Sequence, residues 1–204
     1  MATIKNIIFD LGGVLLNIDY NKTISAFKEL GIENFEEMFS QFHVDKLFEK
    51  LETGRISEND FYETVKKRIP GPVSNDQVET AWNAMILDFR KESLAYLEKL
   101  SGNYALFLLS NTNSIHLKHF QQVFTRETGQ PSLDKYFTTC WYSNIIGLRK
   151  PNKEVYEYVL KDKNLNAAET FFVDDTIDNI RAAMELGIKS HLVLPHERIE
   201  NIQF

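Results

Sequence analysis

The sequence is poor in cysteine. Cys140 is the only one in 204 residues, so the chain cannot form a disulfide with itself. A reducing compartment suits such a chain, and Cys140 lies among strand-forming residues, where we expect a buried thiol. The apolar run near the amino terminus is interrupted by Asp10. It therefore resembles neither a secretory signal nor a membrane span, and we expect a soluble, cytoplasmic protein.

The sequence also has no excess of basic residues. It holds 23 Lys and Arg against 29 Asp and Glu, for a net charge of −6. This balance argues against nucleic acid or an anionic membrane as the main partner. An anionic substrate must then be held by local positive groups. The sequence leaves both a monomer and a homodimer open.

Several common catalytic motifs are missing. No G-x-S-x-G, P-loop or G-x-G-x-x-G motif occurs, which leaves an esterase, a nucleoside triphosphatase or a dinucleotide enzyme without support. His116 and His119 lie three positions apart in a predicted helix, but no cysteine or third ligand accompanies them. We therefore expect them to be partly exposed helix residues rather than zinc ligands.

The hydrophobic pattern predicts an α/β fold. A short apolar strand ends near Asp10, and residues 20 to 100 then show helical periodicity only, with Val78, Trp82, Met85 and Phe89 in one run. Beyond Gly102, strands and helices alternate, which predicts a parallel sheet covered on both faces. We predict a three-layer α/β/α Rossmann-like core of residues 1–16 and 90–204, with residues 17–89 inserted as a helical cap.

Candidate site residues follow the predicted strands at the points where these end. They are Asp10, Leu11 and Gly12 after the first strand, Ser110 and Asn111 after the second, Lys150 after the third, and Asp174 and Asp175 after the fourth. Ligands of open parallel sheets bind beyond the carboxyl ends of the strands, so we expect these residues to form one site. Each signal alone is also typical of a turn, a helix cap or a solvated helix start. Their joint positions indicate a site.

This set of side chains suits phosphoryl transfer. Three nearby carboxylates would repel one another unless a divalent cation such as Mg²⁺ lay between them. Asp10 would attack phosphorus and form an acyl phosphate. Lys150, the Ser110 hydroxyl and backbone N–H groups after Asp10 would stabilise the phosphoryl oxygens. The glycines would let the main chain approach the phosphate closely.

The segments "IIFDLGGVLL", "LLSNTN", "GLRKP" and "FFVDDTIDNIRAAMELGI" resemble, in order and spacing, the four motifs of the haloacid dehalogenase-like (HAD) hydrolase superfamily. The resemblance implies Asp10 as nucleophile, Ser110 as phosphate-binding hydroxyl and Lys150 as the motif lysine. It also implies Mg²⁺ held by Asp174, Asp175, Asp10 and the backbone carbonyl of Gly12. Within the superfamily, the pattern looks most like the bacterial α-glucose-1-phosphate phosphatases.

One position departs from the family pattern. Most phosphatases of this superfamily carry a second aspartate two residues after the nucleophile, as general acid and base, and this chain has Gly12 there. Such catalysis is typically worth about 10²–10⁴-fold, so an ordinary alcohol should leave slowly. The anomeric hydroxyl of a sugar 1-phosphate is a better leaving group. We therefore expect a small phosphorylated metabolite, such as a hexose 1-phosphate, as substrate.

Two other functions stay open. A metal-independent 2-haloacid dehalogenase also lacks the second aspartate, although it would not need Asp174 and Asp175. A phosphate-binding domain with little turnover is the other. Further candidates are His43 and Glu52, as replacement proton carriers, and Arg55, as a substrate contact in a turn. Asp178 and Asn179 would orient Lys150 or a metal-bound water, or simply begin a helix.

Overall fold

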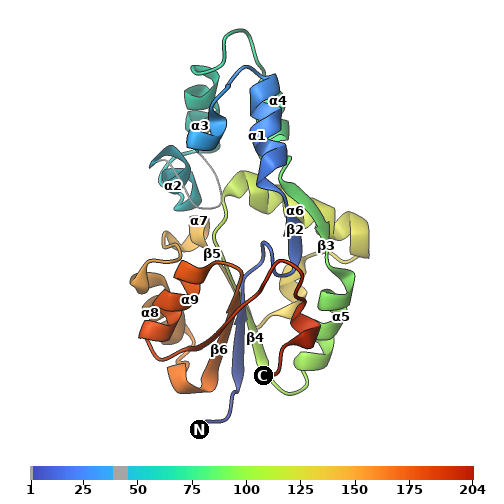
Figure 1. The fold of residues 1–204 in the computed structure, drawn as a ribbon, viewed down its shortest axis with the longest axis vertical. Helices are drawn as coiled ribbons and strands as arrows, with labels where there is room; N and C mark the ends of the chain where they lie inside the picture. The colour runs from blue at the N-terminus through green and yellow to red at the C-terminus, as the bar shows by residue number, and fades with distance from the viewer. Residues whose placement is uncertain (1, 39–45) are drawn as a thin grey trace.

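A five-stranded parallel sheet forms the centre of the protein (Figure 1). This computed structural model describes residues 2–38 and 46–204. In sheet order the strands are β5 (Thr139–Tyr142), β4 (Ala105–Ser110), β1 (Asn6–Phe9), β6 (Thr170–Asp174) and β7 (Lys189–Leu192).

The strand register brings the predicted site residues to one edge of the sheet. Phe9, the last residue of β1, is opposite Leu108 of β4 and Val173 of β6. The backbone N–H of Asp10 continues the ladder by donating to the Val173 carbonyl at 2.8 Å. Asp10 therefore lies between the carboxyl ends of the two neighbouring strands, which is where the sequence predicts it.

Helices cover both faces of this sheet and complete three layers. On one face α5 (Lys91–Leu100) and α6 (Ser114–Thr128) pack against the apolar side chains of β1 and β4. On the opposite face of the sheet, α8 (Lys153–Asp162) and α9 (Ile177–Glu185) bury their apolar side chains against β4 and β6. The predicted three-layer α/β/α fold is confirmed. Shorter elements are α7 (Ser143–Ile146), η2 (Leu133–Tyr136), η3 (Ala167–Glu169) and η4 (Ile199–Asn201).

Four helices from the inserted segment lie together beyond the carboxyl ends of the strands (Figure 1). They are α1 (Tyr20–Glu29), α2 (Lys46–Glu52), α3 (Glu58–Lys66) and α4 (Asn75–Asn83), with the short η1 (Phe35–Glu37) between α1 and α2. Buried aromatic rings hold them together, and Phe48 stacks on Trp82 with 5.1 Å between ring centroids. At the start of α3, Ser57 forms a capping box with Asp60. The exact division at residues 17 and 89 stays a prediction.

The prediction of purely helical structure over residues 20 to 100 is wrong at residues 86–89. Helix α4 ends at Asn83, and β3 (Ile86–Phe89) pairs antiparallel with β2 (Leu16–Ile18). The chain must return beside the segment by which it left the sheet, and pairing satisfies the backbone groups of both. A helix running from Val78 through Phe89 would leave those groups of β2 without partners.

Expectations about a membrane span and about Cys140 can also be compared with the structure. None of the helices among the described residues is long and apolar enough to cross a membrane. Cys140 is half-buried rather than fully buried, and burial raises the pKa of its thiol to about 12. The residues 39–45, which include Phe39, Phe42 and His43, lie outside the described part of the chain.

Candidate active site

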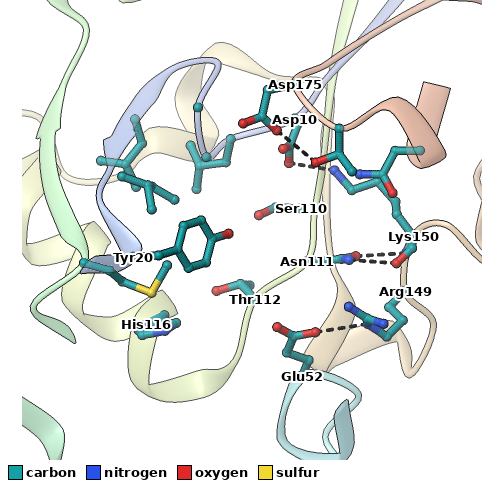
Figure 2. Close-up of a pocket in the computed structure, with 18 of the residues that line it drawn as sticks. Asp10, Tyr20, Glu52, Ser110, Asn111, Thr112, His116, Arg149, Lys150 and Asp175 are labelled. Carbon is teal, nitrogen blue, oxygen red and sulfur yellow. Dashed lines mark hydrogen bonds and ion pairs between the residues drawn. The ribbon is translucent and has the colours of Figure 1, made fainter. Parts of the chain in front are cut away.

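The Lys150 ammonium joins two of the predicted carboxylates. Its Nζ lies 2.7 Å from Oδ1 of Asp10 (Figure 2) and 2.7 Å from Oδ2 of Asp174. The side chain of Lys150 is only 1% exposed and that of Asp174 is fully buried. A buried ammonium is costly unless paired, so these two contacts fix Lys150 in place.

Asp174 is itself held on several sides. The Asn179 amide donates to both of its oxygens, at 2.9 and 3.0 Å, and the Thr176 backbone N–H donates to Oδ1 at 2.8 Å. Asp174 thus has little freedom and orients Lys150 toward Asp10. Asn179, predicted as a residue that would orient Lys150, acts on Asp174. Asp178 is exposed and pairs with Arg181 at 3.4 Å, which favours a helix-surface role.

The loop that carries Lys150 is tied to the end of β4. The side-chain amide of Asn111 donates to the Lys150 carbonyl at 2.9 Å, and the Lys150 backbone N–H donates back to the Asn111 amide oxygen at 2.9 Å. The reciprocal pair places Lys150 beside Ser110, the residue before Asn111. Sequence analysis predicts Asn111 as a substrate-binding residue, and the structure gives it this positioning contact.

The site carries more negative than positive charge. One carboxylate oxygen each of Asp10, Asp174 and Asp175 can be chosen so that all three lie within 4.8 Å of one another. Burial raises the pKa of Asp10 to about 7, the other two carboxylates add to this, and Lys150 opposes it. Burial and Asp174 likewise raise the pKa of Asp175. A divalent cation among these oxygens would offset the excess charge, so the residues fit a metal site.

The glycine pair after Asp10 has two different structural causes. Gly13 has a φ of +71°, and a Cβ there would overlap the carboxylate of Asp175. Gly12 has ordinary φ, but a Cβ there would overlap Cδ1 of Ile18. The tip of the Ile18 side chain, from β2, would have to move aside to admit a side chain at position 12. Close approach of a phosphate to this backbone stays a prediction.

A cavity of about 440 Å³ opens over this cluster. Predicted site residues that line it are Asp10, Leu11, Gly12, Ser110, Asn111, Lys150 and Asp175, and the further candidates Asp178 and Asn179 also border it. Asp174 lies behind Lys150 and is not part of the lining. Further lining residues that sequence reasoning missed include Tyr20, Thr112, His116 and Arg149 (Figure 2). Thr112 and Arg149 lie in the segments "LLSNTN" and "GLRKP" beside predicted site residues, whereas nothing in the local sequence marks Tyr20 or His116 as cavity residues.

The inserted helices contribute Glu52 to the cavity wall. Its Oε2 accepts from Nε of Arg149, the residue before Lys150, at 3.0 Å. The two side chains are 12% and 19% exposed. Burial raises the pKa of Glu52, and Arg149 opposes that shift. Because Glu52 is held as an ion pair, it is a poor candidate for the missing proton carrier. Arg55 is exposed and outside the cavity lining.

The expectation that His116 is partly exposed is wrong. Its ring is 8% exposed and stacks on Trp82 of α4, with 4.6 Å between centroids. Nδ1 lies 2.9 Å from the Asn83 side-chain oxygen. Burial lowers the pKa of His116 to about 3. His119 is half-buried, and neither histidine joins a cluster of potential metal ligands within the described ranges.

Comparison with protein families agrees with this geometry. The family model described as haloacid dehalogenase-like hydrolase matches residues 7–193. The chain belongs to this family and is a HAD-like hydrolase, as the sequence motifs predict.

Three relatives are similar over almost their whole length. The chain is 30% identical to a D-ribitol-5-phosphate phosphatase of Bacteroides thetaiotaomicron, over 92% of this chain and 90% of the relative. It is 32% identical to a sesquiterpene phosphatase of Aspergillus oryzae, over 92% and 88%. A HAD-family enzyme of B. thetaiotaomicron, solved with magnesium and inorganic phosphate as an Asp-to-Ala mutant, has a TM-score of 0.89 at 34% identity, over 95% of this chain and 96% of that one.

Proposed function

We propose that the protein is a Mg²⁺-dependent phosphatase of small phosphorylated metabolites that works through an aspartyl-phosphate on Asp10. One observation carries the proposal: a buried lysine holds Asp10 in a carboxylate cluster that borders the 440 Å³ cavity. The phosphatase names of two relatives and the magnesium and phosphate bound to a third support it.

Asp10, Asp174 and Asp175 would hold the metal, with the Gly12 carbonyl as a further ligand. Of the two residues of the fourth motif, Asp175 borders the cavity, whereas the oxygens of Asp174 are already used by Lys150, Asn179 and the Thr176 backbone. Asp175 is therefore the better candidate for direct metal contact. When bound, Mg²⁺ would offset the charge of the carboxylates and withdraw electron density from the phosphoryl group.

The chain's own residues supply the covalent chemistry. Asp10 would attack phosphorus with one carboxylate oxygen, and Lys150 would stabilise the charge on the phosphoryl oxygens. Ser110, 3% exposed at the end of β4, would donate its hydroxyl to the same oxygens. The backbone N–H groups of Leu11 and Gly12 complete this set as predicted substrate contacts. Water then releases phosphate from Asp10.

A sugar phosphate is the substrate class that we propose. Away from Asp10, the cavity presents the polar side chains Tyr20, Glu52, Thr112 and Arg149, which suit the hydroxyl groups of a sugar or sugar alcohol. The absence of a side-chain acid at Gly12 favours a 1-phosphate, whose anomeric oxygen leaves more easily. The inserted residues 17–89 would act as a cap that closes over this substrate.

A phosphatase screen with and without Mg²⁺ tests the proposal. The panel holds hexose 1-phosphates, hexose 6-phosphates, ribitol 5-phosphate and an isoprenoid monophosphate. We expect release of phosphate that a chelator abolishes, that Asp10→Asn lacks, and that is faster for 1-phosphates than for 6-phosphates. Equal rates on the two hexose phosphates would contradict the substrate class. Halide release that survives the chelator would indicate a dehalogenase, and binding without turnover a phosphate-binding domain.

A further inference from the structure

The leaving group of a bound phosphate must lie on the cap side of the site. In an in-line displacement the attacking and leaving oxygens stand on opposite sides of phosphorus. Asp10 lies at the sheet end of the cavity, while residues of the inserted segment, among them Tyr20 and Glu52, form the opposite wall. The oxygen that leaves therefore faces this wall.

The loop after Asp10 has no group that would assist this oxygen. Gly12 lacks a side chain, and Ile18 fills the space in which one would lie. Ile18 belongs to β2, and two residues later the chain enters α1 at Tyr20. The strand whose Ile18 side chain lies beside Gly12 thus leads directly to a phenol at the cavity wall.

Figure 2 shows the ring of Tyr20 with its hydroxyl pointing into the cavity, toward the space bordered by Ser110, Asn111 and Thr112. Burial is the main reason why the pKa of Tyr20 is raised, and the charges of Asp175, Glu52, Asp10 and Asp174 add to it. The phenol therefore stays protonated. It has a hydrogen to share but does not give up its proton readily.

We propose that the Tyr20 hydroxyl donates a hydrogen bond to the ester oxygen as it leaves phosphorus, and so takes over part of the task of the missing acid. This inference rests on the proposed phosphatase function. Negative charge develops on that oxygen while the bond to phosphorus breaks, and a donor that is already in place stabilises the transition state more than the ground state.

The balance of the reaction does not need Tyr20 to ionise. The Asp10 carboxylate forms a bond to phosphorus, and the bond between phosphorus and the ester oxygen breaks with its electron pair passing to that oxygen. The alkoxide, hydrogen-bonded to Tyr20, takes its proton from water. A second water then attacks phosphorus and breaks its bond to Asp10, which returns the carboxylate and releases inorganic phosphate, and the proton that this water loses neutralises the hydroxide left by the first.

Arg149, Glu52 and Thr112 are less suited to the role. Arg149 is engaged by Glu52 through Nε at 3.0 Å, and Glu52 is an acceptor in that pair. The Thr112 hydroxyl is within 3.5 Å of the Asn113 carbonyl, and the Thr112 backbone is bound on both sides by Ser143. Tyr20 is the longest hydroxyl-bearing side chain among the residues that line the cavity.

Tyr20→Phe tests the proposal, because it removes the hydroxyl and keeps the ring. The measurement is kcat and KM for p-nitrophenyl phosphate, a hexose 1-phosphate and a hexose 6-phosphate, whose leaving groups are progressively less acidic. We expect the loss in kcat to grow in that order, from less than about 3-fold for the aryl ester to about 10–100-fold for the 6-phosphate. A purely structural defect would lower all three rates by one factor.

Tyr62→Phe is the matched control. Tyr62 lies on α3, and its hydroxyl donates to Glu79 at 3.0 Å, outside the cavity lining. The rates of the Tyr62→Phe variant on the three esters should stay within about 2-fold of the wild-type rates. An equal loss on all three esters in Tyr20→Phe, or no loss, would overturn the role of Tyr20 while leaving the phosphatase intact. Wild-type protein that releases phosphate from none of the esters would instead refute the proposed function itself.

Discussion

The Lys150 ammonium nitrogen lies 2.7 Å from Oδ1 of Asp10, with its side chain almost fully buried. Asp10 follows the central strand of the sheet, and Lys150 lies in a loop that Asn111 fastens to the end of β4. Asp174 holds the same ammonium from the other neighbouring strand. The nucleophile that we propose is thus positioned by contacts to both strands that flank it.

Replacement of this lysine by an uncharged chain of similar shape should nearly abolish turnover. In Lys150→Met the carboxylates lose the cation that opposes the raised pKa of Asp10, and the phosphoryl oxygens lose a donor. Loss of one such donor typically costs about 10²–10³ in kcat, and we expect at least the lower value. Steady-state phosphate release measures it.

Lys153→Met is the control for this variant. Lys153 carries the same side chain three positions further on, where it is 58% exposed and paired with Glu157 at 3.1 Å. The substitution removes an identical charge from the surface, and activity should be unchanged. A Lys150→Met enzyme with more than about a fifth of wild-type kcat would show that the ammonium is not needed for catalysis.

Asp175 should control metal affinity more directly than any other side chain of the fourth motif. It borders the cavity, and its carboxylate packs against Gly13. We expect Asp175→Asn to raise the Mg²⁺ concentration for half-maximal activity by about 10–100-fold, with partial recovery at high Mg²⁺. The control, Asp88→Asn, changes an exposed carboxylate that accepts from Asn17 at 3.3 Å. An unchanged Mg²⁺ requirement in Asp175→Asn would exclude Asp175 as a ligand.

The Glu52–Arg149 ion pair should couple the inserted helices to the rest of the protein. A partly buried pair of this kind loses more than a surface pair when one partner is removed. A double-mutant cycle with Glu52→Gln and Arg149→Met, followed by denaturant unfolding, should give a coupling free energy of about 1–2 kcal/mol.

The same cycle on Lys28 and Glu36 provides the comparison. These side chains also form an ion pair, at 3.0 Å, but are 41% and 45% exposed. Their coupling should be below about 0.5 kcal/mol. Equal coupling energies for the two pairs would mean that burial adds nothing to the contact between Glu52 and Arg149.

Much of the core and the site could be predicted because local chemistry marks it. The apolar strands, the glycines after Asp10 and the polar residues at successive strand ends all carry their signal in a few neighbouring positions. Parallel topology then brings Asp10, Lys150 and Asp174 together without further information. The structure confirms the fold and this grouping, and their roles in catalysis stay proposals.

The cap side of the site could not be predicted in the same way. In the sequence, Tyr20 has no feature beyond its place at the start of a helix, and Glu52 none beyond its place at the end of one. Their approach to Arg149 and Ser110 depends on how the insertion returns to the sheet. The insertion returns to the sheet through the pairing of β2 with β3. Strand β3 was not predicted, because Trp82, Met85 and Phe89 have the spacing of a helix. The periodicity of a short segment does not show which distant segment it pairs with, or in which register.

His116 should make the protein sensitive to acid. Its folded-state pKa is lowered from the ordinary value of 6.5 to about 3, because the ring is buried against Trp82 and His119 adds a smaller effect. Below pH 6.5 the unfolded chain therefore binds a proton that the folded protein does not. Stability must fall as the pH decreases from 6.5 toward 3, with a slope that approaches about 1.4 kcal/mol per pH unit.

His116→Gln separates this effect from the titration of carboxylates, because the amide cannot take up the proton. We expect the variant to be less stable than wild type at pH 7.5, where it lacks the ring stacked on Trp82 and the contact with Asn83. The difference in unfolding free energy between wild type and variant should shrink as the pH falls, because only the wild type loses stability when its unfolded chain takes up a proton at position 116. Urea unfolding at pH 7.5, 6.5, 5.5 and 4.5 measures it. A difference that stays constant over this range would show that His116 accepts its proton equally well in both states, and that the buried stack with Trp82 does not exclude charge.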